Sequence, residues 1–221
     1  MIAEELFLLL LDNASATPAL DNPRRRHMLA AAVLLELAHS CHIRPATAGD
    51  PAPEGALLAL EAPGPVHPVA APVWHRLRTR PLKAGTAIKK VGGQTEDLLV
   101  AHLEATGAIR RTPLPGSRFR RDYAFPLTDR DRPGAARAAL TGALFQRRPP
   151  TPSTAAVITV LHAADGLGAL LSLNDRGWRW VHARAGEISA GSWVDEAPSG
   201  LAEVNMAVTA AVVRQALSAL V

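Results

Sequence analysis

Residues 24–39, with the sequence RRRHMLAAAVLLELAH, decide the fold of this chain. After three arginines and one histidine, the stretch consists almost entirely of Ala, Leu and Val. Ala and Leu are strong helix formers, and a helix that is apolar on every side belongs at the centre of a bundle. Asp21 or Asn22 can cap this helix, and Pro23 suits its first turn. We therefore predict a central buried helix over these residues.

The composition of the whole chain extends this prediction. Hydrophobic residues make up 48% of the 221 residues, but only 4% are aromatic. Small aliphatic side chains therefore dominate the interior and let helices approach closely. The length suits one sizeable domain or two small ones sharing a core. We expect residues 1–221 to form a single, mainly α domain: a helical bundle with a protruding β-hairpin and short extended segments.

The sequence also predicts several non-helical segments. Short strands or extended segments are expected at Ile43 and over residues 55–61, and a Pro-rich linker follows at about 63–72. Residues 108–127 have the pattern of a hairpin, in which two arms flank a tip at 113–117 with the sequence PLPGS. These segments divide the helical part of the chain.

Further helices are predicted beyond the linker. Residues Gly92 and Gly93 are expected to break the chain, so that the next helix spans about 98–106. An Ala-rich helix is predicted over 135–148. Residues 155–164 fit a buried helix or a strand equally, because the pattern alone does not decide. Residues 205–221 are predicted to close the chain as a long buried helix.

The net charge of +4 is unevenly distributed along the chain. Residues 1–150 hold 20 basic and 14 acidic residues, a net charge of +6, whereas residues 151–221 hold 4 and 6, a net charge of −2. Basic clusters suit an anionic partner, either a membrane surface or a nucleic acid, although a solvated surface without a ligand also explains any single cluster. The clusters comprise Arg24–Arg26, Arg76, Arg78, Arg80, Lys83, Lys89, Lys90, Arg110, Arg111, Arg118, Arg120 and Arg121.

No motif in the sequence supports catalysis or a cofactor. The Gly-x-Ser-x-Gly nucleophile elbow and the glycine-rich nucleotide motifs are missing from the sequence. His39, Cys41 and His42 are close together, but their spacing matches no standard zinc pattern. We therefore expect no enzymatic activity, no metal site and no cofactor.

The sequence also bears on location. Cys41 is the single cysteine of the chain, which fits a reducing cytosol. The leucine-rich run at 6–11 lacks the basic start and the cleavage site of a secretory signal. No stretch approaches the roughly 20 apolar residues needed to span a bilayer. We expect a cytoplasmic protein that contacts membranes only peripherally.

A series of motifs resembles the Golgi phosphoprotein 3-like family, in the family's order and over nearly the whole chain. The chain is accordingly identified as a bacterial-type member of that family. The motifs are Ala3-Glu4-Glu5-Leu6 with the leucine run to Asp12, Leu34–Ala38 before the strand at Ile43, Leu103–Ile109 before the hairpin, Pro126–Asp129 after it, Leu161–Asp165 and the final Ala/Val helix.

The resemblance implies a fold and a ligand. It implies a helical bundle with a short hairpin and no catalytic activity. Eukaryotic members bind phosphatidylinositol 4-phosphate at Golgi membranes and the tails of Golgi glycosyltransferases, which implies an adaptor role and a protein tail as partner. The family's lipid contacts, a tryptophan and three arginines, fall near Asp21, Ala30, Gly93 and Glu96 here, and none is retained.

Basic residues near those positions form the predicted headgroup site. Arg24, Arg25 and Arg26 lie at a predicted helix start, where backbone amides already favour anions, and arginine adds bidentate phosphate geometry. Lys89 and Lys90 lie close to the other family positions. We expect these five residues to bind an anionic, phosphoinositide-like headgroup.

The hairpin is the predicted contact with a membrane or with a second copy of the chain. Leu114 is its only large apolar tip residue, and basic residues at the tip gain roughly 1 kcal/mol each near an anionic leaflet. Arg118, Arg120 and Arg121 are therefore assigned to this contact together with Leu114, and a homo-oligomer would form through the hairpin.

Two other functions remain open. Helices followed by a basic hairpin also describe a winged helix, with residues 98–106 as the recognition helix and the hairpin as the wing. That helix carries acidic residues and no Lys or Arg, which suits a phosphate backbone badly, so nucleic acid is the less favoured partner. The third alternative is a scaffold without a ligand.

Overall fold

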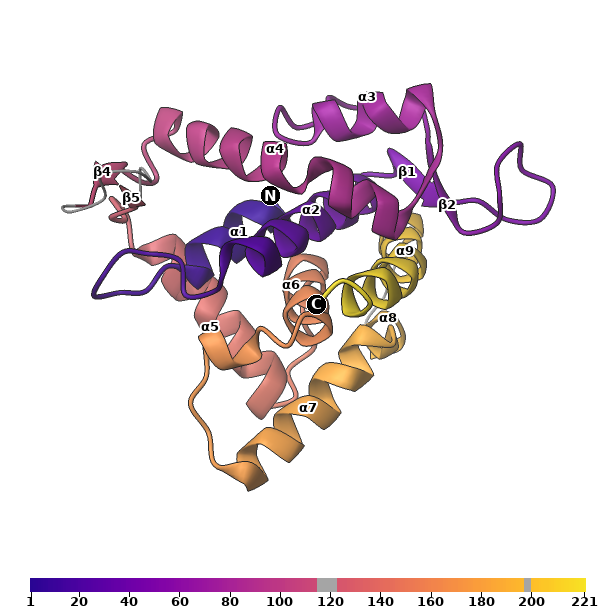
Figure 1. Ribbon diagram of the computed structural model, residues 1–221. Helices are drawn as coiled ribbons and strands as arrows, with labels where there is room; N and C mark the ends of the chain where they lie inside the picture. The colour runs from indigo at the N-terminus through magenta and orange to yellow at the C-terminus, as the bar shows by residue number, and fades with distance from the viewer. Residues whose placement is uncertain (115–122, 197–199) are drawn as a thin grey trace.

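The computed structural model describes residues 1–114, 123–196 and 200–221. These residues are mainly helical, as predicted (Figure 1). The helices are α1 (Ile2–Leu10), α2 (Asn22–His39), α3 (Ala71–Thr79), α4 (Ala84–Ala105), α5 (Asp131–Phe145), α6 (Pro152–Ala163), α7 (Asp175–Ser189), α8 (Ser192–Glu196) and α9 (Leu201–Ser218), with a 3-10 turn, η1, at Leu167–Ala169. The strands are β1 (Ile43–Pro45), β2 (Ala56–Ala59), β3 (Leu82–Lys83), β4 (Thr112–Pro113) and β5 (Tyr123–Ala124).

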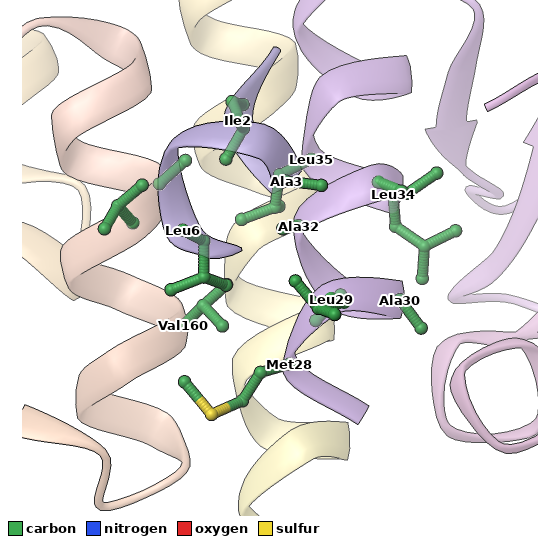
Figure 2. Packing of buried hydrophobic residues seen from close by; sticks show 14 of the residues in the cluster. Ile2, Ala3, Leu6, Met28, Leu29, Ala30, Ala32, Leu34, Leu35 and Val160 are labelled. Atoms are coloured by element: carbon green, nitrogen blue, oxygen red, sulfur yellow. The ribbon is translucent and has the colours of Figure 1, made fainter. Parts of the chain in front are cut away.

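Helix α2 is the buried centre of the molecule, as its sequence predicts. Every residue from Met28 to Leu35 is buried, and α1, α4, α6 and α9 all pack against this helix (Figure 1). Figure 2 shows Leu6 of α1 and Val160 of α6 beside the apolar residues of α2. The carboxylate of Asp21 caps the helix by accepting a hydrogen bond from the backbone N–H of Arg24 at 3.1 Å.

Short strands follow α2, again as predicted. The strands β1, β2 and β3 pair in that order as an antiparallel sheet, in which Ile43 lies opposite Ala59 and Ala56 lies opposite Lys83. Asn205 of α9 joins the sheet to α2, because its side-chain amide donates to the carbonyl oxygens of Ala38 and Ile43 at 2.7 and 2.8 Å. This sheet directs the chain into α3 and then into α4.

The predicted break at Gly92 and Gly93 is wrong. Helix α4 begins at Ala84, well before the predicted start near 98, and continues through both glycines. A Cβ atom on Gly92 would lie 3.1 Å from the carbonyl oxygen of Arg26, so the glycine allows α4 to cross the start of α2 closely. Packing against α2 therefore outweighs the helix cost of about 1 kcal/mol per glycine.

Other boundaries also differ from the sequence prediction. The segment 155–164, left undecided between helix and strand, belongs to helix α6. The last two residues of the predicted linker 63–72 already form the start of α3. The buried helix predicted over 205–221 is a helix, α9, but it is only partly buried, because Val208 is 54% exposed.

The base of the predicted hairpin is present. Thr112 lies opposite Ala124 and Pro113 opposite Tyr123, and a further bridge joins Ile109 to Leu127. Leu114 is 36% exposed at the start of the tip. The three arginines assigned to the membrane or oligomer contact, Arg118, Arg120 and Arg121, lie outside the described residues.

Candidate anion-binding surface

The start of α2 carries two arginines that share one carboxylate. The Nε atom of Arg25 donates to Oε1 of Glu96 at 2.6 Å, and the Nε atom of Arg26 donates to Oε2 at 3.0 Å. Glu96 belongs to α4 and its side chain is only 10% exposed, while the side chains of Arg25 and Arg26 are 12% and 43% exposed. These charge-assisted bonds join α2 to α4, and the summed charge of Arg25, Arg26 and Glu96 is +1.

Arg24 is also engaged within the molecule. Its Nε atom lies 3.4 Å from a carboxylate oxygen of Asp21, and its Nη1 atom lies 3.5 Å from the carbonyl oxygen of Asp165. The structure thus brings the three predicted headgroup arginines together, but gives each of them an acidic partner from the same chain. Arg26 is the most exposed of the three.

The predicted lysines lie on α4 beside the start of α2. Lys89 and Lys90 are exposed and form no ion pair with any described residue. Lys89 lies near His27 of α2. Burial, and then the positive charge of Lys89, lower the pKa of His27. The fold therefore places Lys89 beside the basic start of α2, whereas Lys90 lines a groove toward α3.

A groove between α3 and α4 extends this region. It has a volume of about 530 Å³ and is lined by Pro72, His75, Arg76, Thr79, Arg80, Leu82, Lys90 and Gln94. No acidic side chain is among these lining residues, and neither Arg76 nor Arg80 forms an ion pair within the described chain. In Figure 1, α3 lies along the first half of α4, where this groove forms. The groove can therefore offer three cationic side chains, those of Arg76, Arg80 and Lys90, to a single anion.

Sequence reasoning missed the role of α3 in this surface. Arg76 lies in the last turn of α3, and Arg80 follows the helix directly in an extended conformation; both line the groove. Arg78 points elsewhere: its guanidinium lies 4.7 Å from the ring centre of Trp74 and 3.1 Å from Glu61. The sequence identifies Arg76, Arg78 and Arg80 only as a cluster. Residues 74–82 alternate basic and other residues, a pattern that fits a helix or an extended chain equally well.

Comparison with known proteins gives the family. The family model described as Golgi phosphoprotein 3 (GPP34) matches residues 2–204. The chain belongs to the GPP34 family. The match extends from α1 to the first residues of α9 and includes the whole of the basic surface. No curated protein matches the chain in the corresponding search.

A second hollow lies at the base of the hairpin and includes Glu96, one of the four positions at which the family resemblance predicts a lipid contact. This hollow has a volume of about 210 Å³, and its lining includes Asn22, Arg26 and Glu96 together with Asp97 and Arg111. Arg111 is paired with Glu104 at 3.1 Å. The two carboxylates in the lining make this hollow less suited to an anion than the groove between α3 and α4.

None of the helices in residues 1–114, 123–196 and 200–221 is both long enough and apolar enough to cross a membrane.

Proposed function

We propose that this GPP34-family protein binds the phosphorylated headgroups of anionic lipids at a membrane surface. The family resemblance favours phosphatidylinositol 4-phosphate as the headgroup. The observation that carries the proposal is the α3–α4 groove, where Arg76, Arg80 and Lys90 line a hollow without an acidic side chain. In this proposal the protein acts by binding, associates peripherally with the cytoplasmic face of a membrane, and serves as an adaptor for a protein tail.

The chemistry of the groove suits a phosphate monoester. Such a group carries between one and two negative charges near neutral pH and three acceptor oxygens. Arg76 and Arg80 can each present two parallel N–H groups to a phosphate, whereas Lys90 contributes a compact charge. Gln94 adds an amide donor, and Pro72 and Leu82 supply apolar surface for the carbon ring of a headgroup.

The remaining predicted residues take supporting roles in this proposal. Lys89 adds an exposed charge beside the groove, and Arg26 is the headgroup arginine with the largest exposed fraction. Arg24 and Arg25 contribute to the field near the surface, although their own chain already pairs them. Leu114 and the hairpin arginines Arg118, Arg120 and Arg121 are proposed to contact the membrane or a second copy of the chain.

Liposome sedimentation tests the proposal. Vesicles of phosphatidylcholine alone are compared with vesicles containing phosphatidylserine or phosphatidylinositol 4-phosphate at equal total charge. We expect recovery on anionic vesicles only, a preference for the phosphorylated headgroup, and loss of binding at high salt, because exposed charges are screened within about 10 Å at 0.1 M salt. Equal recovery on neutral and anionic vesicles would defeat the proposal.

Charge-matched variants locate the site. The double substitution Arg76→Gln with Arg80→Gln should abolish the preference for the phosphorylated headgroup. The control is Arg176→Gln with Arg179→Gln, which removes the same charge from exposed positions on α7, at the far end of the molecule from α3 (Figure 1). Equal losses in the two double variants would show that binding follows net charge and not the groove.

The nucleic-acid alternative gains no support from the position of α4. The expected recognition helix, residues 98–106, corresponds to the end of the longer helix α4. Earlier in α4, Gly92 packs against α2 and Glu96 pairs with Arg25 and Arg26. The outward residues Asp97 and Glu104 would oppose a phosphate backbone. A gel shift at physiological salt separates the two functions, since a lipid-specific groove predicts no retarded band.

A further inference from the structure

Three metal-ligating side chains from distant parts of the chain converge beside α1. Glu4 comes from α1, His67 from the segment that precedes α3, and His102 from the last turn of α4. Oε1 of Glu4 lies 3.4 Å from Nε2 of His67 and 3.2 Å from Nε2 of His102. One ligand atom from each residue lies within 4.8 Å of the other two.

We propose that Glu4, His67 and His102 form a binding site for a divalent transition-metal ion of the Zn²⁺ type. Zinc bonds to histidine nitrogen and carboxylate oxygen are about 2.0–2.2 Å long, so neighbouring ligand atoms in a tetrahedral site lie about 3.3–3.5 Å apart. Both carboxylate-to-imidazole distances are already close to this separation. Imidazole ligands favour Zn²⁺ and related ions over Mg²⁺ and Ca²⁺, which prefer all-oxygen sites.

The surroundings hold the carboxylate in the orientation that the site requires. Glu4 is buried, with 8% of its side chain exposed, and its second oxygen, Oε2, accepts a hydrogen bond from Nη2 of Arg132 on α5. This contact leaves Oε1 facing the two imidazoles. Ligating carboxylates in metal sites are commonly hydrogen-bonded by outer-shell residues, which orient them.

The two histidines are arranged so that both can reach one ion. Their rings meet edge to face with centres 4.8 Å apart, and their side chains are 27% and 26% exposed. A metal ion would therefore keep access to water, and among residues 1–114, 123–196 and 200–221 the group has three protein ligands. Three ligands with a fourth position for water are typical of an open zinc site.

Binding of a metal ion would change the hydrogen bond between Val69 and His67. The backbone N–H of Val69 donates to Nδ1 of His67 at 3.3 Å, which assigns the ring proton to Nε2 when no metal is bound. Coordination through Nε2 moves this proton to Nδ1 and gives up the Val69 contact, while the total number of ring protons is unchanged. The neutral imidazole is the form of histidine that binds a metal ion.

A bound ion would connect α1, the segment before α3 and the end of α4. Since no such preformed site exists in the unfolded chain, the metal should stabilise the fold. At a free Zn²⁺ concentration about 100-fold above Kd, the expected rise in Tm is about 5–10 °C for a chain of this size.

The test is titration of the chelator-treated full chain with Zn²⁺ and with Co²⁺. We expect one ion per chain by calorimetry, a rise in Tm with Zn²⁺, and the visible absorption of four-coordinate Co²⁺. His67→Gln and His102→Gln should each remove this binding. Arg132→Gln should weaken it by about 10–100-fold, as removal of an outer-shell partner does.

Two controls separate the site from other ligands of the chain. His182→Gln removes an exposed imidazole outside the group, and Cys41→Ser removes the single thiol; both variants should bind the metal ion like the wild type. Circular dichroism without metal checks that each variant folds, and His102→Gln changes a half-buried position that tolerates a polar side chain. Failure of the wild type to bind one ion, or unchanged binding in the folded His67 and His102 variants, would overturn the proposal.

Discussion

Replacement of Glu96 by glutamine should loosen the contact between α2 and α4 while it strengthens binding to anionic vesicles. Glu96 joins two guanidinium groups through bonds of 2.6 and 3.0 Å. Glutamine keeps the shape of the side chain, but it leaves Arg25, 12% exposed, without a counter-charge. It also raises the summed charge of the three residues from +1 to +2.

The expected stability loss follows from the exposure of the two pairs. Breaking a buried ion pair by removing one partner costs about 3–5 kcal/mol, whereas an exposed pair contributes about 0.2–1 kcal/mol. Arg25 is close to the first case and Arg26, 43% exposed, is close to the second. Since glutamine retains one acceptor, we expect a loss of about 2–4 kcal/mol in the free energy of unfolding.

Urea denaturation at pH 7 measures this loss. Its matched control is Glu104→Gln, because Glu104 pairs with Arg111 at 3.1 Å with both side chains about one-third exposed; that change should cost less than about 1 kcal/mol. If Glu96→Gln were as stable as Glu104→Gln, the Glu96 pairs would not hold α2 against α4. If the folded Glu96→Gln variant were recovered on anionic vesicles less than the wild type, the electrostatic account of the surface would be refuted.

Two further predictions concern the packing and its pH dependence. Gly92→Ala should destabilise the protein by about 1–3 kcal/mol, because the new methyl group would press on the carbonyl oxygen of Arg26 at 3.1 Å. Gly93→Ala should be neutral or stabilising by up to about 1 kcal/mol, because its methyl group would lie 4.0 Å from Nη1 of Arg26, at the end of a flexible side chain. Equal stabilities of the two variants in thermal melts would contradict the close crossing. Arg184, 3% exposed, binds both carboxylate oxygens of Glu196 at 2.8 and 2.9 Å and so holds the pKa of Glu196 below its ordinary value of 4.5. Because the pKa is lowered, this stabilisation is complete above pH 4.5 and is lost as the pH falls through the folded-state pKa. Arg184→Met should therefore weaken the fall in the free energy of unfolding at acid pH. If urea titrations showed the same fall as in the wild type, the Arg184–Glu196 pair would not be its cause.

Local patterns predicted the centre of the fold well. The burial of α2 follows from the apolar residues around its whole circumference, and its start follows from Asp21 and Pro23, which act within one turn. The strands β1 and β2 were also predicted from short-range signals. In each case the deciding interactions lie within a few residues of one another in the sequence.

The features that escaped prediction depend on contacts between distant residues. The pair of glycines at 92 and 93 reads locally as a helix break, and only the position of Arg26 explains why the helix continues. Likewise, the charge of Arg25 cannot be judged without Glu96, which is 71 residues away. No spacing rule connects Glu4, His67 and His102, because three separate segments bring them together.

The central claim is that the groove between α3 and α4 holds the anionic headgroup. Titration of ¹⁵N-labelled protein with inositol 1,4-bisphosphate, followed by amide chemical shifts, tests it most directly. The account predicts saturable shifts centred on Arg76, Arg80 and Lys90, which disappear in the Arg76→Gln, Arg80→Gln variant. Shifts centred instead on Asn22 and Tyr123 at the base of the hairpin, or no saturable shift at all, would contradict it.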